Sequence, residues 1–414
     1  MTHHEHTRRT FHYERWRAFS QGILETAGTT FLLLVAVRYF AAGPTSKALI
    51  AAGGSLGLLF SPLVVSTVEA LGWTTARAAM RLSLLGAVCL LVMAALPSLP
   101  VYVPGAMLAT ACAAASIPLM TQIYQENYPT RERGRMFTRT ITLRIGMSAL
   151  FSELAGRALT ADIGRFRWLL LAFAAAFLFS AFCFSRIPSK PLSGSGGTHP
   201  FASLRFANHD PLFRHTLICW MFMGMGNLMM YPLRVEYLAN PVYGVRPYGT
   251  DLDVGTVAFL TGVIPNVARL LTSHLWGWLF DHMNFFALRA TLNLGFALGI
   301  LTFFTSDSLT GLILGSIIFG VSNGGGDVAW SLWVTKFAPP ERVADYMSVH
   351  TFFTGVRGLL APFLGFYLAH VFSMATVGWF SAVLIVISAL MLLTEVKFDR
   401  KRHPGEPLTE EISE

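Results

Sequence analysis

The sequence predicts an all-α polytopic membrane protein with twelve transmembrane helices in two pseudo-symmetric six-helix bundles. The first observation is composition: 53% of the 414 residues are hydrophobic and 13% are charged, whereas soluble domains carry about 25% charged residues. The second is that apolar runs of about 20 residues, the length of a membrane-spanning helix, recur along the chain. The third is a polar segment rich in proline, glycine and serine that divides these runs into two sets of six.

Hydropathy places the twelve helices in order. The predicted spans are residues 18–40, 47–69, 78–96, 101–125, 138–159, 167–186, 214–238, 254–279, 287–305, 309–335, 345–370 and 375–396. The two bundles therefore cover residues 18–186 and 214–396, with a cytoplasmic linker over 187–213 between them. Polar tails cover residues 1–17 and 397–414. The first tail lacks the cleavage site of a signal peptide, which favours a cytoplasmic segment.

The distribution of lysine and arginine predicts the orientation. With both termini in the cytoplasm, cytoplasmic segments hold 21 of these residues and the opposite side holds seven, as the positive-inside rule requires. Topology thus explains the net charge of +8, and no nucleic-acid partner is expected. We expect a monomeric, multi-pass protein of the bacterial inner membrane. No metal or cofactor is expected, because the four cysteines lie within apolar runs without metal-ligand spacing.

The two halves of the chain repeat each other at a constant offset of 209 residues. The segments that include the loops before spans 5 and 11 and the spans themselves both carry a Glu-Arg pair followed by an aromatic residue and two glycines. The matched positions are Glu132-Arg133 with Glu341-Arg342, Phe137 with Tyr346, Gly146 with Gly355, and Gly156 with Gly365. The six-helix unit is therefore duplicated.

This duplicated twelve-helix plan resembles the major facilitator superfamily. The segment GWLFDHMNFFALR is similar to the superfamily's Gly-x-x-x-Asp-Arg-x-Gly-Arg loop at Gly277, Asp281 and, further along, Arg289. His282 and Asn284 depart from that pattern. The resemblance implies a transporter whose halves rock around a central cavity lined by helices 1, 4, 7 and 10. It also implies that Gly277, Asp281 and Arg289 act in gating on the cytoplasmic side.

Polar residues at helical spacing mark the faces of the spans that turn inward. The expected solute-binding residues on these faces are Trp220, Asn227 and Tyr231 of span 7, Arg269 of span 8, Asn323 of span 10 and Arg357 of span 11. The polar stripe of span 7 continues to Arg234. The alternative for each residue is a hydrogen bond between helices with no ligand contact.

Ionisable groups inside a membrane are costly and are usually functional. The family arrangement and the depths of the residues predict two ion pairs, Glu25–Arg144 and Asp327–Arg269. Glu153 and Arg157, four residues apart on span 5, are expected to pair with each other. Arg357 is then left without an acid, so we expect it to bind a carboxylate or phosphate of the solute. The alternatives are structural: a bond from Arg357 to backbone carbonyls freed near Pro362, or a switch to Asp327.

The leading function is secondary transport of a small anionic or amphipathic organic solute. The proton gradient is one candidate driving force, with Glu25, Asp327, Arg144 and His350 as coupling residues; His350 is alternatively a satisfied core residue. No phosphate-binding glycine loop for ATP is present. The alternatives are an exporter of drug-like or lipid-like molecules, and a sensor or scaffold that no longer transports. An enzyme is not expected, because its best cluster, Asp281-His282, already has a gating explanation.

Overall fold

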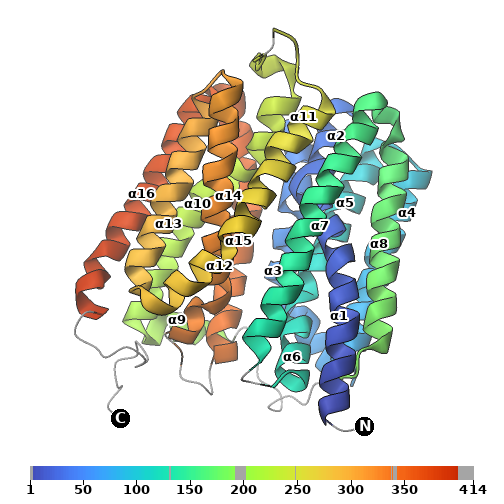
Figure 1. Ribbon diagram of the computed structural model, residues 1–414, viewed down its shortest axis with the longest axis vertical. Coiled ribbons are helices and arrows are strands. Elements are labelled where there is room, and N and C mark those ends of the chain that lie inside the picture. The colour runs from blue at the N-terminus through green and yellow to red at the C-terminus, as the bar shows by residue number, and fades with distance from the viewer. Residues whose placement is uncertain are drawn as a thin grey trace.

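The computed structural model describes residues 3–129, 132–191, 202–247, 249–336, 338 and 343–399. The described chain is built from helices, with one isolated β-bridge between Thr74 and Pro191. Figure 1 shows two bundles side by side, the first from blue to green and the second from yellow to red. The predicted all-α, two-bundle fold class is therefore confirmed.

In the first bundle, a break in the α-helical hydrogen bonding divides the first membrane span into α1 and α2. A second break divides the fourth membrane span into α5 and α6. The elements are α1 (His3–Thr26), the π-helical η1 (Ala27–Phe31), α2 (Leu32–Arg38), α3 (Pro44–Ala70), α4 (Thr75–Ala95), α5 (Leu99–Ala115), α6 (Ile117–Asn127), α7 (Arg133–Ala161), η2 (Ile163–Arg165) and α8 (Phe166–Arg186).

Two short helices of the linker precede the second bundle, whose second membrane helix again contains a π-helical segment. The linker helices are η3 (Ala202–Arg205) and α9 (Phe206–His209). The bundle consists of α10 (Pro211–Ala239), η4 (Pro241–Tyr243), α11 (Val254–Ala258), η5 (Phe259–Val263), α12 (Ile264–His282), α13 (Phe285–Phe304), α14 (Leu309–Leu332), η6 (Trp333–Lys336), α15 (Val343–Val371) and α16 (Met374–Asp399).

Eleven helical stretches in the described residues are long and apolar enough to cross a membrane. The predicted fifth span, α7, is as long as its neighbours but is not among the eleven, because charged residues recur along it. It packs against α1 in its own bundle and against α11 and α12 of the second bundle. Its Leu150 and Leu154 are exposed on the outside of the bundle. The predicted fifth span is therefore present as a helix, but it is more polar than the other eleven.

The first helix begins at His3, so the predicted start at residue 18 is too late. Two side-chain networks hold its first turns against α6. Arg17 donates to both carboxylate oxygens of Glu14 at 2.6 and 2.7 Å, and Tyr124 Oη donates to Glu14 Oε1 at 2.5 Å. Asn127 Nδ2 also donates to Thr10 Oγ1 at 2.9 Å. These partners are distant in sequence, so hydropathy alone misses them.

The bundles meet along two helix pairs that the duplication relates, α3 with α15 and α7 with α11 and α12. Glycines of α15 permit the first approach: a Cβ atom on Gly355 would overlap the Leu59 backbone, and one on Gly358 would overlap Ser55. These small residues therefore allow the two helices to pack closely.

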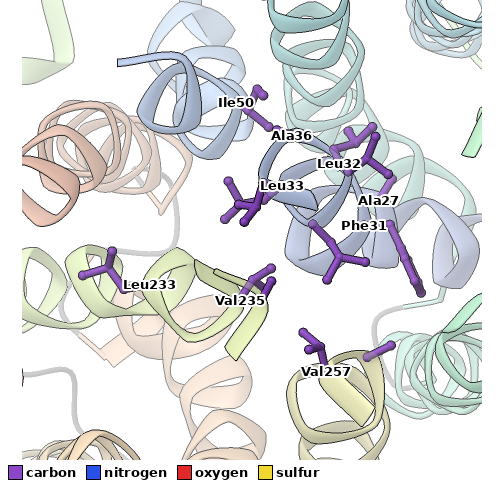
Figure 2. Close-up of a cluster of buried hydrophobic side chains, with 14 of the residues drawn as sticks. Ala27, Phe31, Leu32, Leu33, Ala36, Ile50, Leu233, Val235 and Val257 are labelled. Carbon is purple, nitrogen blue, oxygen red and sulfur yellow. The ribbon is translucent and has the colours of Figure 1, made fainter. Parts of the chain in front are cut away.

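We call the end of the molecule where α1 begins and α16 ends the tail end and the opposite end the outer end (Figure 1). Near the outer end, one buried apolar cluster joins both bundles. Figure 2 shows Leu33 of α2 on the side that faces Leu233 and Val235 of α10, and Ala36 beside Ile50 of α3. All six residues from Leu32 to Val37 are buried, which fixes α2 between the bundles.

Candidate functional site

An arginine at the interface of the two bundles binds two carboxylates from different helices. Arg269 Nη1 lies 2.5 Å from Glu25 Oε1 of α1, and Arg269 Nε lies 2.5 Å from Asp327 Oδ2 of α14. The Arg269 side chain is 5% exposed. Because Glu25 belongs to the first bundle and Arg269 to the second, this arginine ties the bundles together at mid-depth.

Arg144 of α7 extends this group to four charges. Its Nε lies 3.0 Å from Glu25 Oε2, as an ion pair without hydrogen-bond geometry. The predicted pairs Glu25–Arg144 and Asp327–Arg269 are thus confirmed. The contact between Glu25 and Arg269 is new, since the prediction kept each acid within its own bundle. The four charges, Arg144, Glu25, Arg269 and Asp327, cancel one another and are called the central ion chain below.

Two small cavities lie at the centre of the molecule, and both are lined by Thr29 and Tyr231. One has a volume of about 10 Å³ and is lined by Glu25, Thr29, Tyr231, Arg234, Thr261, Pro265, Asn266, Arg269, Phe319 and Asn323. The other, of about 50 Å³, is lined by Gly28, Thr29, Leu33, Ala51, Ser55, Leu228, Tyr231, Pro232, Gly358 and Pro362. Such volumes hold a few water molecules at most. Neither cavity can hold an organic molecule in this conformation.

Arg234 contributes a fifth charge to this region, and no acid in the described residues pairs with it. Its Cζ lies 3.7 Å from the ring centroid of Phe319 and 4.6 Å from that of Tyr231. The residue is 4% exposed, and its Nη1 has no hydrogen-bond partner among the described residues. The central region therefore carries one uncompensated positive charge. The continuation of the polar stripe of span 7 to Arg234 was the sequence signal for this position.

The predicted solute-binding residues divide into two groups. Tyr231, Arg269 and Asn323 line the central cavities. Asn227 lies on α10 one turn from Tyr231, and its buried Oδ1 has no partner among the described residues. Trp220 and Arg357 are not among the lining residues of either cavity.

Arg357 lies between α10 and α15, inside the second bundle. Its Nη1 donates to the backbone oxygen of Trp220, and its Nη2 donates to Thr354 Oγ1 at 3.2 Å. A Cβ atom on Gly224 would overlap this side chain, which shows how closely α10 covers it. The expectation that Arg357 faces the cavity is therefore corrected. The structural alternative is the one present, but the accepting carbonyl is that of Trp220 and not one near Pro362.

The expected gating role of Arg289 requires a position in the cytoplasmic loop, but Arg289 does not lie there. Asn284 caps α13 by accepting from the Ala287 backbone N–H, so the helix already includes Arg289. The side chain is 1% exposed and points inward, with its Cζ 3.7 Å from the Trp220 ring centroid. His350 is also buried, surrounded by the rings of Trp220, Trp330 and Trp333.

Gly277 and Asp281 lie in the last turns of α12 at the tail end. Asp281 is exposed. Most of the loop that we expect it to contact, between spans 10 and 11, lies outside the described residues. Its gating role stays a prediction.

The outer end is closed by bonds between the bundles. Lys47 Nζ of α3 lies 2.5 Å from Glu236 Oε1 of α10, with side chains 9% and 1% exposed. Arg38 Nη2 donates to the backbone oxygen of Leu252 at 2.6 Å. Among the described residues, the hydrogen bonds between bundles lie at this end or near the central ion chain. The Asp327 side chain, in contrast, is 33% exposed. The structure is therefore closed at the outer end.

Comparisons with known proteins agree with the resemblance inferred from the sequence. Residues 235–413 match the family model of the Major Facilitator Superfamily. No match was found among curated proteins.

Solved transporter structures share the fold over nearly the whole chain. A nucleoside transporter, NupG, aligns with a TM-score of 0.72 at 12% identity, covering 94% of this chain and 99% of that one. A bacterial homolog of the human lysosomal transporter Spinster, inward-facing and occupied, aligns at 0.69 with 13% identity, covering 96% and 98%. A D-xylose-proton symporter aligns at 0.63 with 14% identity, covering 94% and 95%.

Proposed function

Since the chain is a multi-pass membrane protein with the fold of major facilitator superfamily transporters, we propose that it is a secondary transporter of a small anionic or amphipathic organic solute. The observation that carries this proposal is the unpaired, buried guanidinium of Arg234 beside the central cavities. We further propose that the protein acts as a monomer in a bacterial inner membrane, with the tail end in the cytoplasm.

The charge balance at the centre favours a solute with one negative group. Arg269 and Arg144 are neutralised by Glu25 and Asp327, whereas Arg234 is held only by aromatic rings and by a 3.4 Å bond from its Nε to the Tyr231 carbonyl. A planar guanidinium with a free N–H edge suits a carboxylate or phosphate. The rings of Tyr231 and Phe319 beside it suit an apolar part of the same molecule.

We derive the proposed transport cycle from the contacts that join the two bundles. Opening the outer end must break the Lys47–Glu236 pair and separate α2 from α10 and α11. The same rocking changes the distance between Glu25 and Arg269, because they belong to different bundles. Asp327 and Arg269 lie in one bundle, so their pair can persist through the cycle.

This difference singles out Glu25 as the proposed proton carrier. A carboxylate that loses a neighbouring cation binds a proton more readily. Glu25 loses Arg269 when the bundles part but keeps Arg144, whereas Asp327 keeps its partner. We therefore propose proton coupling through Glu25, with Asp327 serving mainly to orient Arg269.

An exporter of drug-like or lipid-like molecules would have a wide apolar cavity and an Arg357 turned away from it. Arg357 is indeed turned away. The smaller cavity, however, is lined by Glu25, Arg234 and Arg269, a charged lining that favours an anionic solute over an uncharged one.

A ligand screen on the purified protein tests the proposed solute class. We expect organic acids or phosphate esters to raise the melting temperature, since a ligand that binds only the folded state stabilises it. Matched amides or alcohols, which lack the negative charge, serve as controls and are expected to have no effect. Stabilisation by neutral sugars or cationic drugs, with no response to any anion, would contradict the proposed solute class.

A further inference from the structure

A second group of buried cations lies inside the second bundle, away from the central cavities. It consists of Arg289, Arg357, His350 and Trp220, and we call it the arginine cluster. The Trp220 ring centroid is 3.7 Å from Arg289 Cζ and 5.5 Å from Arg357 Cζ. Exposed fractions are 1% for Arg289 and His350 and 4% for Arg357 and Trp220. Both guanidinium groups are therefore buried, and both lie near the same Trp220 ring.

The cluster has more hydrogen-bond donors than acceptors. Arg289 Nη2 contacts only Met223 Sδ, a weak acceptor, at 3.0 Å. Arg289 Nη1, Arg357 Nε, Trp220 Nε1 and His350 Nε2 have no partner among the described residues. No carboxylate in that part of the chain forms an ion pair with either arginine.

The surroundings cannot compensate for these charges. The cluster adjoins a buried apolar core that includes Phe213, Phe285 and Leu292. A buried cation is stable only when it is paired and hydrogen-bonded. The Trp220 ring offsets part of the cost, but it leaves the N–H groups unsatisfied. An added acceptor with a negative charge would satisfy several of them at once.

We infer that the arginine cluster binds a small inorganic anion such as chloride, held by Arg289 and Arg357 with N–H groups of Trp220 and His350. A small anion suits this cluster, because α10 packs so closely on the Arg357 side chain that even a Cβ atom on Gly224 would overlap it. A weakly hydrated anion also suits the aromatic surroundings. Because all four residues belong to one bundle, the anion would stabilise that bundle throughout the transport cycle and would not be the transported solute.

The test compares the melting temperature of the full-length protein in sodium chloride and in sodium gluconate at equal ionic strength. We expect a saturable rise of about 1–3 °C with chloride. Arg289→Met is expected to abolish the rise. Arg234→Met, which removes the other unpaired buried arginine, is expected to retain it. Loss of the rise in Arg234→Met and its retention in Arg289→Met would place the anion in the central cavity and overturn the inference.

A second measurement applies even if Arg289→Met does not fold. Iodide quenches indole fluorescence on contact, so binding beside Trp220 is expected to give a saturable quenching component that chloride reverses. Trp220→Phe is expected to lose this component while retaining the linear, collisional part. Linear quenching alone in the wild type, together with a melting temperature that does not depend on the anion, would overturn the inference.

Discussion

Replacing Glu236 by glutamine is expected to open the outer end of the molecule. The substitution leaves the Lys47 ammonium buried without its partner in the closed state. Breaking a buried ion pair in this way costs roughly 3–5 kcal/mol. In an outward-open state Lys47 would be exposed to water and the cost would disappear. The equilibrium between the two states is therefore expected to shift by more than about a hundredfold.

Spin labels at Ser98 and Val242, which are exposed at the outer ends of the two bundles, would report the opening as a longer distance. The double variant Lys47→Met, Glu236→Met is expected to close again, because an apolar pair leaves no buried charge. Glu153→Gln is the matched control, since its partner Arg157 is 79% exposed. An unchanged distance in Glu236→Gln would show that the buried pair does not hold the outer end closed.

Replacing Glu25 by glutamine is expected to abolish accumulation of the solute against a gradient while sparing exchange of solute for solute. A glutamine carries no titrating proton, so binding and rocking continue without coupling. The measurement is uptake into proteoliposomes with an imposed pH gradient, followed by counterflow without one. Asp327→Asn is the matched control and is expected to remain concentrative at a reduced rate, since Arg269 loses one of its two acids. If Glu25→Gln still concentrates the solute and Asp327→Asn does not, Asp327 would be the proton carrier and Glu25 would not.

Much of the fold could be predicted because hydropathy and charge asymmetry act locally along the chain. The polar α7 shows the limit of hydropathy alone. Its length and its match to α15 at the offset of 209 residues predict a span, although its arginines make it too polar by composition. The early start of α1 could not be predicted, because it depends on the distant partners Tyr124 and Asn127.

The candidate site was predictable where pairing stays within one bundle, as for Glu25–Arg144 and Asp327–Arg269. The Glu25–Arg269 contact could not be predicted, since it depends on how closely the bundles approach in one conformation. Arg357 and Arg289 show a different limit. The position of a residue along its helix gives the depth of its side chain in the membrane. It does not show whether the side chain faces the cavity or the interior of its own bundle.

The central claim is that Arg234 anchors an anionic group of the solute, and direct binding tests it most directly. An anionic ligand from the screen would be titrated into wild-type protein and into Arg234→Lys and Arg234→Met, each shown to be folded and monodisperse. Loss of a charge-assisted bond in a dry site costs roughly 1.5–3 kcal/mol, or about ten- to over a hundredfold in affinity. We expect that loss in Arg234→Met and a smaller one in Arg234→Lys. Binding by Arg234→Met within twofold of the wild type would contradict the claim.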